Sequence, residues 1–390
     1  MRTRDMSIKI TELYIYPIKS LRLMSVRSTR LLREGLQHDR RFMLLKAEAN
    51  GRHTNVQISK FPECALFAQA LDGDYVVVTY QTLEADHEYA GQKELRVPLD
   101  PAVEDLQANG TVDILLFGSA TSALRVGDEY DAWFSARLGY LAVLVYIGDS
   151  RRSVLAHAPP PPPVPKSWFS SVTSFLPSYL YQQSPQGKGE EEKLVFNEVA
   201  PFLLTSRASL RDVEARMMPG GEGVDMIKFR PNIVVDEVPS PSSIPPSAAA
   251  TTAPTPDDRD NHEPILSPWD EDFWGEIAVG PSRHRLALTA NCARCVSVDI
   301  DYATGKRTDV VLKRLMRDRR VDAGNKWSPI FGRYSFLLLP SSSMGGDSSG
   351  RDEETGIEDE AALLAADVAV GDEVEVTRRL DERDVWAWPK

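Results

Sequence analysis

The sequence lacks the features that mark a membrane-spanning, secreted or disulfide-bonded protein. No run approaches the ~20 apolar residues that a transmembrane helix needs, and the start, MRTRDMSIKI, contains no apolar core of signal-peptide length. The chain has only three cysteines, Cys64, Cys292 and Cys295. An odd, low count argues against a disulfide framework. We therefore expect a cytoplasmic protein without a transmembrane segment, and leave an association with mitochondria open.

Excess positive charge is missing as well. The formal net charge is −12, and three low-complexity stretches, residues 158–192, 237–268 and 340–367, together carry all of it. The rest of the chain is formally neutral. Because nucleic-acid binding usually needs a basic face, we expect no nucleic-acid partner.

What is present is typical of a globular protein. The hydrophobic fraction is 42%, and 390 residues suffice for two or three domains. Alternation of apolar and polar residues predicts short strands, and three- to four-residue spacing predicts a helix in 131–143, over at least the first half of that segment. We therefore expect a β-rich domain with some helix over residues 8–155. Its predicted strands span residues 10–16, 25–32, 41–45, 75–80 and 95–99.

A low-complexity linker is predicted over 158–192, because Pro, Ser, Gln and Gly cannot bury enough apolar surface to order it. Its apolar island at 168–181 would pack back on the domain or contact a membrane interface. A second domain is expected over 193–380, with disordered insertions at 237–268 and 340–367. It has short predicted strands and helices at 209–217 and 310–317. The fold class expected is mainly β with some α (α+β), including a β-barrel.

Two polar motifs near the start of the chain predict an anion site. Lys19 and Ser20, in YPIKS, follow a predicted strand and offer a cation and a hydroxyl. Downstream, a turn leads into Arg40 and Arg41. A point charge, a hydroxyl donor and guanidinium forks suit a phosphate-bearing ligand. Surface charge near turns is the alternative for each motif taken alone.

A second polar set lies in the later domain. Thr205 and Ser206 end an apolar run just before the helix predicted from residue 209. Hydroxyls at a helix start can bind an anion, although a plain N-cap is the alternative. Arg230 and Asn232 stand two residues apart at a strand start, so they share a face. Buried polar groups need partners, which a ligand or an internal salt bridge would supply.

The segment NCARC, residues 291–295, carries the most chemical information. A CxxC motif suggests zinc, a redox dithiol or a soft-metal site. Zinc is disfavoured because a second cysteine pair and suitably spaced histidines are absent. A dithiol is disfavoured because residues 296–301 are predicted as a strand. A single-thiolate site remains, in which Arg294 would favour the thiolate that a soft metal requires. Two small packing residues at a strand start are the alternative.

Seven motifs, in one order along the chain, resemble the MOSC family preceded by its N-terminal β-barrel domain. They are YPIKS, GLQHDRR, PFLLTS, FRPNIVV, PWDEDFW, NCARC and KWSPIFGRY. Within the family the resemblance is to the amidoxime-reducing components and their bacterial homologues. It covers nearly the whole chain apart from the three low-complexity stretches.

The resemblance implies a molybdenum–molybdopterin cofactor and the residues that bind it. Cys295 matches the family's Arg-Cys pair and would be the metal ligand and the catalytic residue. The sequence departs from the family at His38 and at residues 54–57, where the family usually has Thr-x-Arg. The implied cofactor contacts are Lys19, Ser20, Arg40, Arg41, Thr205, Ser206, Arg230, Asn232 and Arg294.

The activity implied is two-electron reduction of small N-hydroxylated substrates by oxygen-atom transfer, in a monomer. Electrons would come from a b-type cytochrome and a flavin reductase. A sulfur carrier with a persulfide on Cys295 and a non-catalytic cofactor-binding protein are the rival hypotheses. Pyridoxal phosphate is not expected, since no Schiff-base lysine motif is visible. The membrane anchor of the animal reductases is missing, so their mitochondrial location does not transfer.

Overall fold

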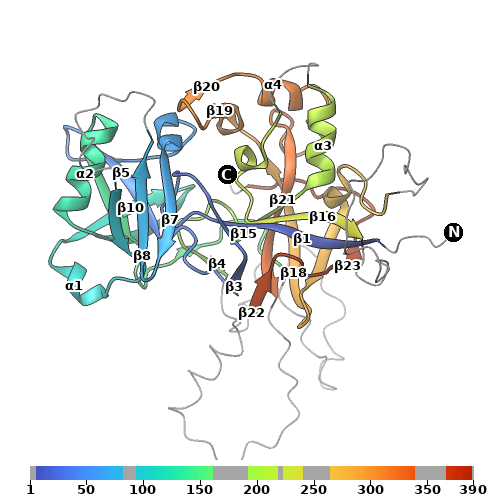
Figure 1. The fold of residues 1–390 in the computed structure, drawn as a ribbon, viewed down its shortest axis with the longest axis horizontal. Coiled ribbons are helices and arrows are strands. Elements are labelled where there is room, and N and C mark those ends of the chain that lie inside the picture. The colour runs from blue at the N-terminus through green and yellow to red at the C-terminus, as the bar shows by residue number, and fades with distance from the viewer. Residues whose placement is uncertain are drawn as a thin grey trace, which may run out of the picture.

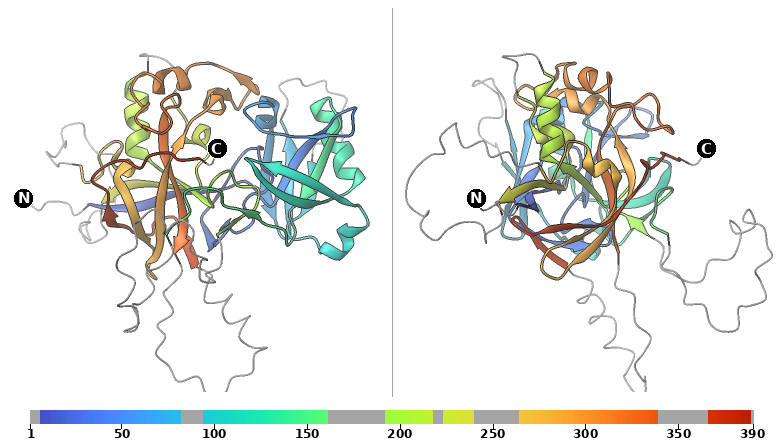
Figure 2. Two further views of the ribbon diagram at one scale, coloured as in Figure 1. Left: turned by 180° about the vertical axis from the view of Figure 1, so that it is seen from behind. Right: turned by 90° about the vertical axis from the view of Figure 1, so that its right-hand side faces the viewer.

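Two β-rich bodies lie side by side in the computed structural model (Figure 1). The structure describes residues 6–81, 94–160, 192–217, 223–239, 264–338 and 366–388. The view from behind in Figure 2 shows the same arrangement. One body is a nearly closed barrel, and the other carries helices α1 (Val103–Gln107) and α2 (Asp128–Leu138) on its outer side. The mainly β fold class with few helices is thus confirmed.

Eight strands form the barrel, and its two edges nearly meet. Lys9 of the first strand makes an antiparallel bridge to Glu373, next to the last strand, so the sheet curls back on itself. Closure of this kind leaves little free sheet edge. In sheet order the strands are β2 (Met24–Val26), β1 (Met6–Ile15), β16 (Ile233–Pro239), β15 (Phe202–Ser206), β21 (Ile330–Leu338), β18 (His284–Ala293), β17 (Trp274–Val279) and β23 (Val374–Arg379).

The first strand separates two hydrophobic cores. Leu13 and Ile15 belong to the barrel core, which also buries Trp274. Tyr14 and Tyr16 belong instead to a second core with residues of α3 (Arg207–Ala215). This division follows from the alternation of side chains along a strand. Along the chain, helix α3 comes after β15 and before β16. These two strands are parallel, and a parallel pair requires a crossover connection, which contains α3.

Strand β1 lies within the segment predicted as one domain over residues 8–155, yet it belongs to the barrel sheet. This strand pairs with β16, from Met6 opposite Pro239 to Leu13 opposite Ile233. The chain therefore starts in the barrel, leaves it, and returns at β15. Alternation predicts that a strand exists, but it does not identify a partner more than 200 residues away.

The N-terminal body begins at β5 and is built from two sheets. Its core contains Phe42, Phe67, Val78, Phe134 and Leu144, so that α2 and both sheets share one apolar interior. The five-stranded sheet has the order β10 (Thr111–Leu116), β11 (Ser119–Arg125), β12 (Ala142–Tyr146), β5 (Phe42–Ala47) and β6 (His53–Asn55). The three-stranded sheet has the order β7 (Phe67–Asp72), β8 (Tyr75–Tyr80) and β9 (Glu94–Pro98).

Short pairings and single turns complete the described structure. The short strands are β3 (Ser28–Leu32), β4 (Gly35–Leu36), β13 (Arg152–Ser153), β14 (Lys193–Leu194), β19 (Ile300–Asp301), β20 (Lys306–Arg307) and β22 (Ala366–Ala369). The remaining helices are η1 (Pro62–Leu66), η4 (Met226–Phe229), η6 (Asp270–Phe273), η7 (Val296–Asp299) and α4 (Val311–Leu315).

Several predicted elements are confirmed, and one is wrong. The strand at 75–80 is β8, and the helices at 209–217 and 310–317 are α3 and α4. The helix predicted over at least the first half of 131–143 is confirmed as α2. It ends at Leu138, where Gly139 adopts a left-handed φ of 74°, and β-branched residues then contribute to β12. The strand predicted over 296–301 is mostly the turn η7. The β18–β21 ladder ends at Ala293 opposite Ile330, so the following residues have no strand to join.

The low-complexity stretches fall mainly outside the described residues, as does the island at 168–181. Their predicted limits are too wide at several ends. Residues 237–239 belong to β16, and Asp367 belongs to β22, which pairs with β3. Leu266 is buried in the barrel core, and the Glu237 carboxylate accepts hydrogen bonds from the Ile265 and Leu266 amides.

Candidate functional site

A cleft opens between the barrel and the N-terminal body, where loops from both meet. Lys19 and Ser20 follow β1, residues 57–59 follow β6, and Asn232 precedes β16. Residues 292–293 end β18, and residues 294–295 follow it. Strand ends with extended loops are common places for binding sites, because the strands hold the loops in position. The lining residues are Lys19, Ser20, Arg40, Gln57, Ile58, Ser59, Asn197, Glu198, Ala200, Phe202, Leu203, Phe229, Arg230, Asn232, Cys292, Ala293, Arg294, Cys295, Ser297 and Tyr334.

Two guanidinium groups of the cleft lie against one tyrosine ring. The Arg40 and Arg230 guanidinium carbons are 4.5 and 4.4 Å from the centroid of Tyr16. Tyr16 is fully buried and donates a hydrogen bond to the Pro231 carbonyl at 3.0 Å. The ring therefore fixes both cations through cation–π attraction, while the carbonyl fixes the ring.

The backbone at these cations is itself unusual. Ser20, Arg40 and Arg230 have φ of 77°, 52° and 51°, in the left-handed region that non-glycine residues seldom adopt. Such conformations persist only where surrounding contacts hold them, and they concentrate at functional sites. Here the Ser20 hydroxyl donates to the Val56 carbonyl at 2.8 Å, and Arg230 Nη1 donates to the Leu21 carbonyl at 3.1 Å.

Asp39 holds the polar groups at the base of the cleft together. Its buried carboxylate accepts hydrogen bonds from the Tyr16 amide at 2.8 Å, from Asn232 Nδ2 at 3.1 Å and from Arg40. Asn232 Oδ1 accepts in turn from Arg40 Nη1 at 3.2 Å and from the Leu203 amide at 3.3 Å. Asn232 is thus engaged within the protein and orients Arg40.

Lys19 is a buried cation that faces Glu198. Its Nζ donates to the Phe196 carbonyl at 2.8 Å and lies 3.9 Å from Glu198 Oε1. Burial lowers the pKa of Lys19 to about 7, since Arg40, Arg152 and Arg230 add repulsion while Glu198 opposes the shift. A bound anion would therefore raise the charge of Lys19 as well as contact it.

Glu198 is the one carboxylate among the described residues that line the cleft. Its side chain lines the cleft and is 53% exposed. Burial raises its pKa, but the combined attraction of Lys19, Arg40, Arg230 and Arg294 is larger and holds the pKa below the usual value. The cleft therefore has a positive potential that favours anions.

Arg152 supports the loop that carries Glu198. This fully buried guanidinium donates to four carbonyl groups, those of Leu116, Val195, Asn197 and Glu198. Burial lowers its pKa to about 10, although Glu198 raises it. Because Leu116 belongs to β10, Arg152 connects the N-terminal body to the cleft loop.

The two cysteines of residues 292–295 have different surroundings. Cys292 is buried, and burial raises its pKa. Cys295 is exposed in the cleft, at the start of η7, with its Sγ 3.3 Å from Ser297 Oγ. Arg294 donates from Nη1 to Cys292 Sγ at 3.0 Å and from Nη2 to the Phe229 carbonyl, while its Nε is buried without a partner in the described structure. In the described structure the Arg294 guanidinium thus contacts Cys292 and Phe229, whereas the sequence predicts that it favours a thiolate at Cys295.

Three predicted ligand contacts lie elsewhere. Ser206 is the N-cap of α3, where its hydroxyl accepts from the Ala208 and Ser209 amides. Thr205 is fully buried and donates to Met226 Sδ at 3.3 Å. Arg41 donates to the Tyr146 hydroxyl at 3.1 Å and the Gly148 carbonyl at 3.0 Å. For Ser206, the plain N-cap interpretation describes the structure.

Comparison with known families now adds to this geometry. Residues 7–140 match the MOSC N-terminal beta barrel domain, and residues 263–375 match the MOSC domain. The chain is a MOSC-domain protein. Cys295, Arg294 and β21 lie within the second match, and Lys19 and Arg40 lie within the first. The cleft is therefore shared between the two MOSC domains.

Curated relatives of this MOSC protein fall into two groups. A "Molybdenum cofactor sulfurase" of Aspergillus clavatus is 25% identical over 84% of this chain, and that of Aspergillus niger is 25% identical over 90%. The chain spans only 38% and 40% of their lengths. "Mitochondrial amidoxime reducing component 2" of Rattus norvegicus is 24% identical over 83% of this chain and 78% of its own length.

The residues of the MOSC cleft fit an anionic, metal-bearing cofactor. Four cations and only one carboxylate line it, and one buried nitrogen, Arg294 Nε, lacks a partner among the described residues. An exposed thiol from Cys295 stands in the same cleft. Guanidinium and ammonium groups bind phosphate, and thiolate binds soft metals.

No helix in the described part of the chain is long and apolar enough to cross a membrane.

Proposed function

We propose that this MOSC protein binds a molybdenum cofactor in the cleft and acts as an oxidoreductase on small N-hydroxylated substrates. The observation that carries the proposal is the exposed Cys295 thiol in a cleft lined by Lys19, Arg40, Arg230 and Arg294. A soft ligand for the metal and cations for a phosphate-bearing pterin are thereby combined in one place. When bound, the cofactor supplies two-electron redox and oxygen-atom-transfer chemistry.

The protein's own contribution is to bind and orient. Arg40 and Arg230 are held against Tyr16, so they lose little side-chain freedom when an anion arrives. Lys19 gains a proton as it pairs with the anion, since its pKa in the free protein is about 7. Cys295 offers its sulfur from the fixed start of η7. Ser20 and Asn232 complete the polar wall.

The relatives support an oxidoreductase as the general class of protein, but they do not identify the specific reaction. The amidoxime-reducing components match 78% and 79% of their own lengths with this chain, so most of each relative is represented. The sulfurases are matched over less than half of their lengths. We therefore prefer the reductase, with electrons supplied by a separate protein.

The decisive experiment is metal and cofactor analysis of protein purified from a host that makes molybdopterin. We expect about one molybdenum and one pterin per chain, with turnover of an N-hydroxylated test compound by a chemical reductant. Bound cofactor without turnover would indicate that the protein binds the cofactor but is not a catalyst. Absence of both cofactor and turnover would refute the proposal.

A sulfur carrier is the second candidate, favoured by the sulfurase relatives and the exposure of Cys295. The Cys295 thiolate would attack the terminal sulfur of a donor persulfide, form a persulfide on Cys295 and release the donor thiolate. Mass analysis after incubation with a donor persulfide distinguishes it. A sulfur adduct on Cys295, in protein that lacks turnover, would favour the carrier.

A further inference from the structure

Residues 381–388 follow the last barrel strand and form neither helix nor strand. Strand β23 ends at Arg379, and the match to the MOSC domain ends at residue 375, so this segment lies beyond both. In the left view of Figure 2 the dark red end of the ribbon crosses the barrel toward the N-terminal body. Because no sheet ladder holds the segment, its position depends on the groups that it contacts.

Asn291, the first residue of NCARC, is held by three groups from distant parts of the chain. Its side chain is buried. Its Oδ1 accepts a hydrogen bond from Arg333 Nη1 at 2.8 Å, and its Nδ2 donates to Asp322 Oδ2 at 3.0 Å. The same Nδ2 also donates to the carbonyl of Asp384, in the segment, at 2.8 Å. Both polar atoms of the amide are thus engaged within the protein, directly before Cys292.

The segment also supplies a counter-charge to Arg333. This guanidinium is fully buried on β21 and donates to the Leu288 and Trp274 carbonyls at 2.9 and 3.2 Å. The described structure pairs it with the carboxylate of Asp384. A buried charge that loses its partner is costly, so the ion pair fixes Asp384 and, with it, the carbonyl that holds Asn291.

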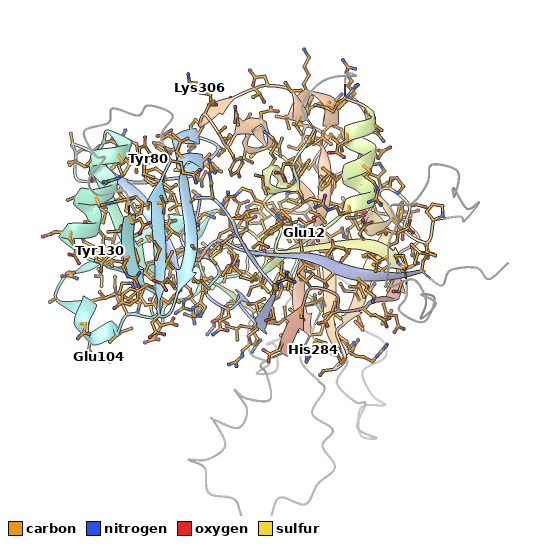
Figure 3. The ribbon with its side chains drawn as sticks, viewed as in Figure 1. Glu12, Tyr80, Glu104, Tyr130, His284 and Lys306 are labelled. Carbon is orange, nitrogen blue, oxygen red and sulfur yellow. The ribbon has the colours of Figure 1, made fainter. Side chains whose placement is uncertain are left out.

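The connection between β18 and β21 contacts the segment from another side. Figure 3 shows Lys306 of this connection at the upper edge of the molecule, pointing outward. The chain then returns to the barrel past Asp322 and Gly324. The Trp386 amide donates to Asp322 Oδ1 at 2.9 Å. A Cβ on Gly324 would lie 1.9 Å from the Trp386 carbonyl oxygen, so only glycine leaves room for the segment here.

Two tryptophans of the segment cover an apolar cluster of the cleft wall. The rings of Trp386 and Trp388 are stacked, with centroids 5.6 Å apart, and both pack against the cluster that contains Cys292 and Tyr334. The centroid of Trp386 also lies 4.7 Å from that of His157 and 6.4 Å from that of Tyr334. Cys292 and Tyr334 line the cleft. The segment therefore supports the wall that carries both cysteines of NCARC.

We propose that residues 381–388 position Cys295 for the cofactor, and that Asn291 is the positioning residue through which they act. The inference rests on the proposed function, because it is the bound cofactor that requires Cys295 in one place. The three partners of Asn291 fix the end of β18, from which the chain continues to Cys295. A ligand group must be held to within about 0.5 Å of its productive position. Displacement of the segment should consequently release the cofactor while the barrel remains folded.

The test compares variants that displace the segment with variants that do not. Gly324→Ala forces the Trp386 backbone away, and Trp386→Ala removes a ring that covers Cys292. The matched controls are Gly223→Ala, where a Cβ makes only an ordinary contact 3.5 Å from Glu214, and Trp386→Phe, which keeps an aromatic ring. All variants are made in the full chain. The cofactor-loaded protein is measured for molybdenum and pterin retained during dialysis. The cofactor-free protein is measured for iodoacetamide labelling of each cysteine by mass spectrometry.

The cysteines report different events in this labelling. Cys292 reports the wall beneath the segment, whereas Cys64 is buried in the core of the N-terminal body and reports general unfolding. We expect Gly324→Ala and Trp386→Ala to speed both the labelling of Cys292 and the loss of cofactor about tenfold, with Cys64 still protected. Gly223→Ala and Trp386→Phe should stay within about twofold of the unaltered protein in both measurements.

Three results would overturn the proposal. Protection of Cys292 in both displacing variants would show that the segment does not support this wall. Labelling of Cys64 together with Cys292 would show that the segment stabilises the whole fold instead. Labelling of Cys292 with normal retention of the cofactor would show that the end of β18 need not be fixed. Absence of cofactor from the unaltered protein would refute the proposed function, while the labelling of Cys292 would still decide whether the segment holds residues 291–295.

Discussion

Arg294 donates a hydrogen bond to the sulfur of Cys292 at 3.0 Å, although its neighbour in sequence, Cys295, has the exposed thiol. The cation therefore contacts the sulfur that is buried. Burial raises the pKa of Cys292, and the attraction of Arg294 only partly opposes it. The CxxC spacing thus joins two chemically different sulfurs.

Substitution should separate the two cysteines. Cys295→Ser should abolish reductase activity and molybdenum binding while leaving some pterin bound, because the thiolate is the expected metal ligand. Cys292→Ser should keep most activity. Iodoacetamide should label Cys295 quickly and Cys292 only after unfolding, since only Cys295 is exposed. Activity, molybdenum and pterin are measured on both variants. Equal loss in both would indicate a dithiol site.

Anion affinity should depend on the protonation of Lys19. Its pKa is about 7, so the free cleft loses a positive charge as the pH rises through 7. Sulfate, which does not titrate in this range, should bind the cofactor-free protein about tenfold more weakly at pH 8.5 than at pH 6. Lys19→Arg should remove this dependence, because arginine stays charged. The pH profile is measured by calorimetry, and an unchanged profile in Lys19→Arg would contradict the assignment.

Loss of Arg230 should weaken cofactor retention more than it disturbs the fold. A charge-assisted hydrogen bond of this kind contributes about 1.5–3 kcal/mol, roughly a 10- to 150-fold change in affinity. Because Arg230 has a φ of 51°, Arg230→Ala retains backbone strain, whereas Arg230→Gly relieves it. We expect both variants to lose cofactor in dialysis, with the glycine variant melting higher. A variant that unfolds yet keeps its cofactor would make Arg230 a structural residue.

Two deletions test where the insertion in the later domain ends. Replacing residues 240–263 by a short Gly/Ser bridge should change the melting temperature little, because these residues are rich in proline and small polar residues. Replacing 237–268 should destabilise the protein, because it removes buried Leu266 and the Glu237 carboxylate that binds its amide. Thermal unfolding compares the two. Equal melting temperatures would show that Leu266 contributes nothing to the core.

Glu271 should make stability fall as the pH rises. Burial raises its pKa to about 7, with further repulsion from Asp272, while the Ser209 hydroxyl donates to Oε2 at 2.8 Å. The folded state thus keeps a proton that the unfolded state releases near its ordinary pKa. Stability should decline between about pH 4.5 and 7, by up to about 1.4 kcal/mol per pH unit. Urea unfolding should show this decline, and Glu271→Gln should flatten it.

Local sequence patterns identified much of the fold and part of the site. Alternation located β8, and the helix predicted at 209–217 is α3. Lys19, Arg40, Arg230 and Cys295 were predicted as site residues and do line one cleft. Their roles in binding remain predictions.

What the patterns could not provide is long-range pairing. Asp39 accepts a hydrogen bond from Asn232, which lies 193 residues later in the sequence. Arg152 donates hydrogen bonds to Leu116 and to the loop at 195–198, and only folding brings these groups together. Glu198 has no sequence signal, since an isolated acid before an apolar run is ordinary surface. Thr205 and Ser206 do have a sequence signal, but it is ambiguous, because hydroxyl groups at the start of a helix suit both an anion site and an N-cap.

The pairing of β1 with β16 has a consequence for how the protein is made. During synthesis the first strand emerges more than 200 residues before its partner, so it must wait while the sheets of the N-terminal body can already form. The barrel can close only once β23 has arrived against Lys9. Lys19 and Ser20, which directly follow β1, therefore reach their final places late. Ligand binding should be among the last properties that the nascent chain acquires.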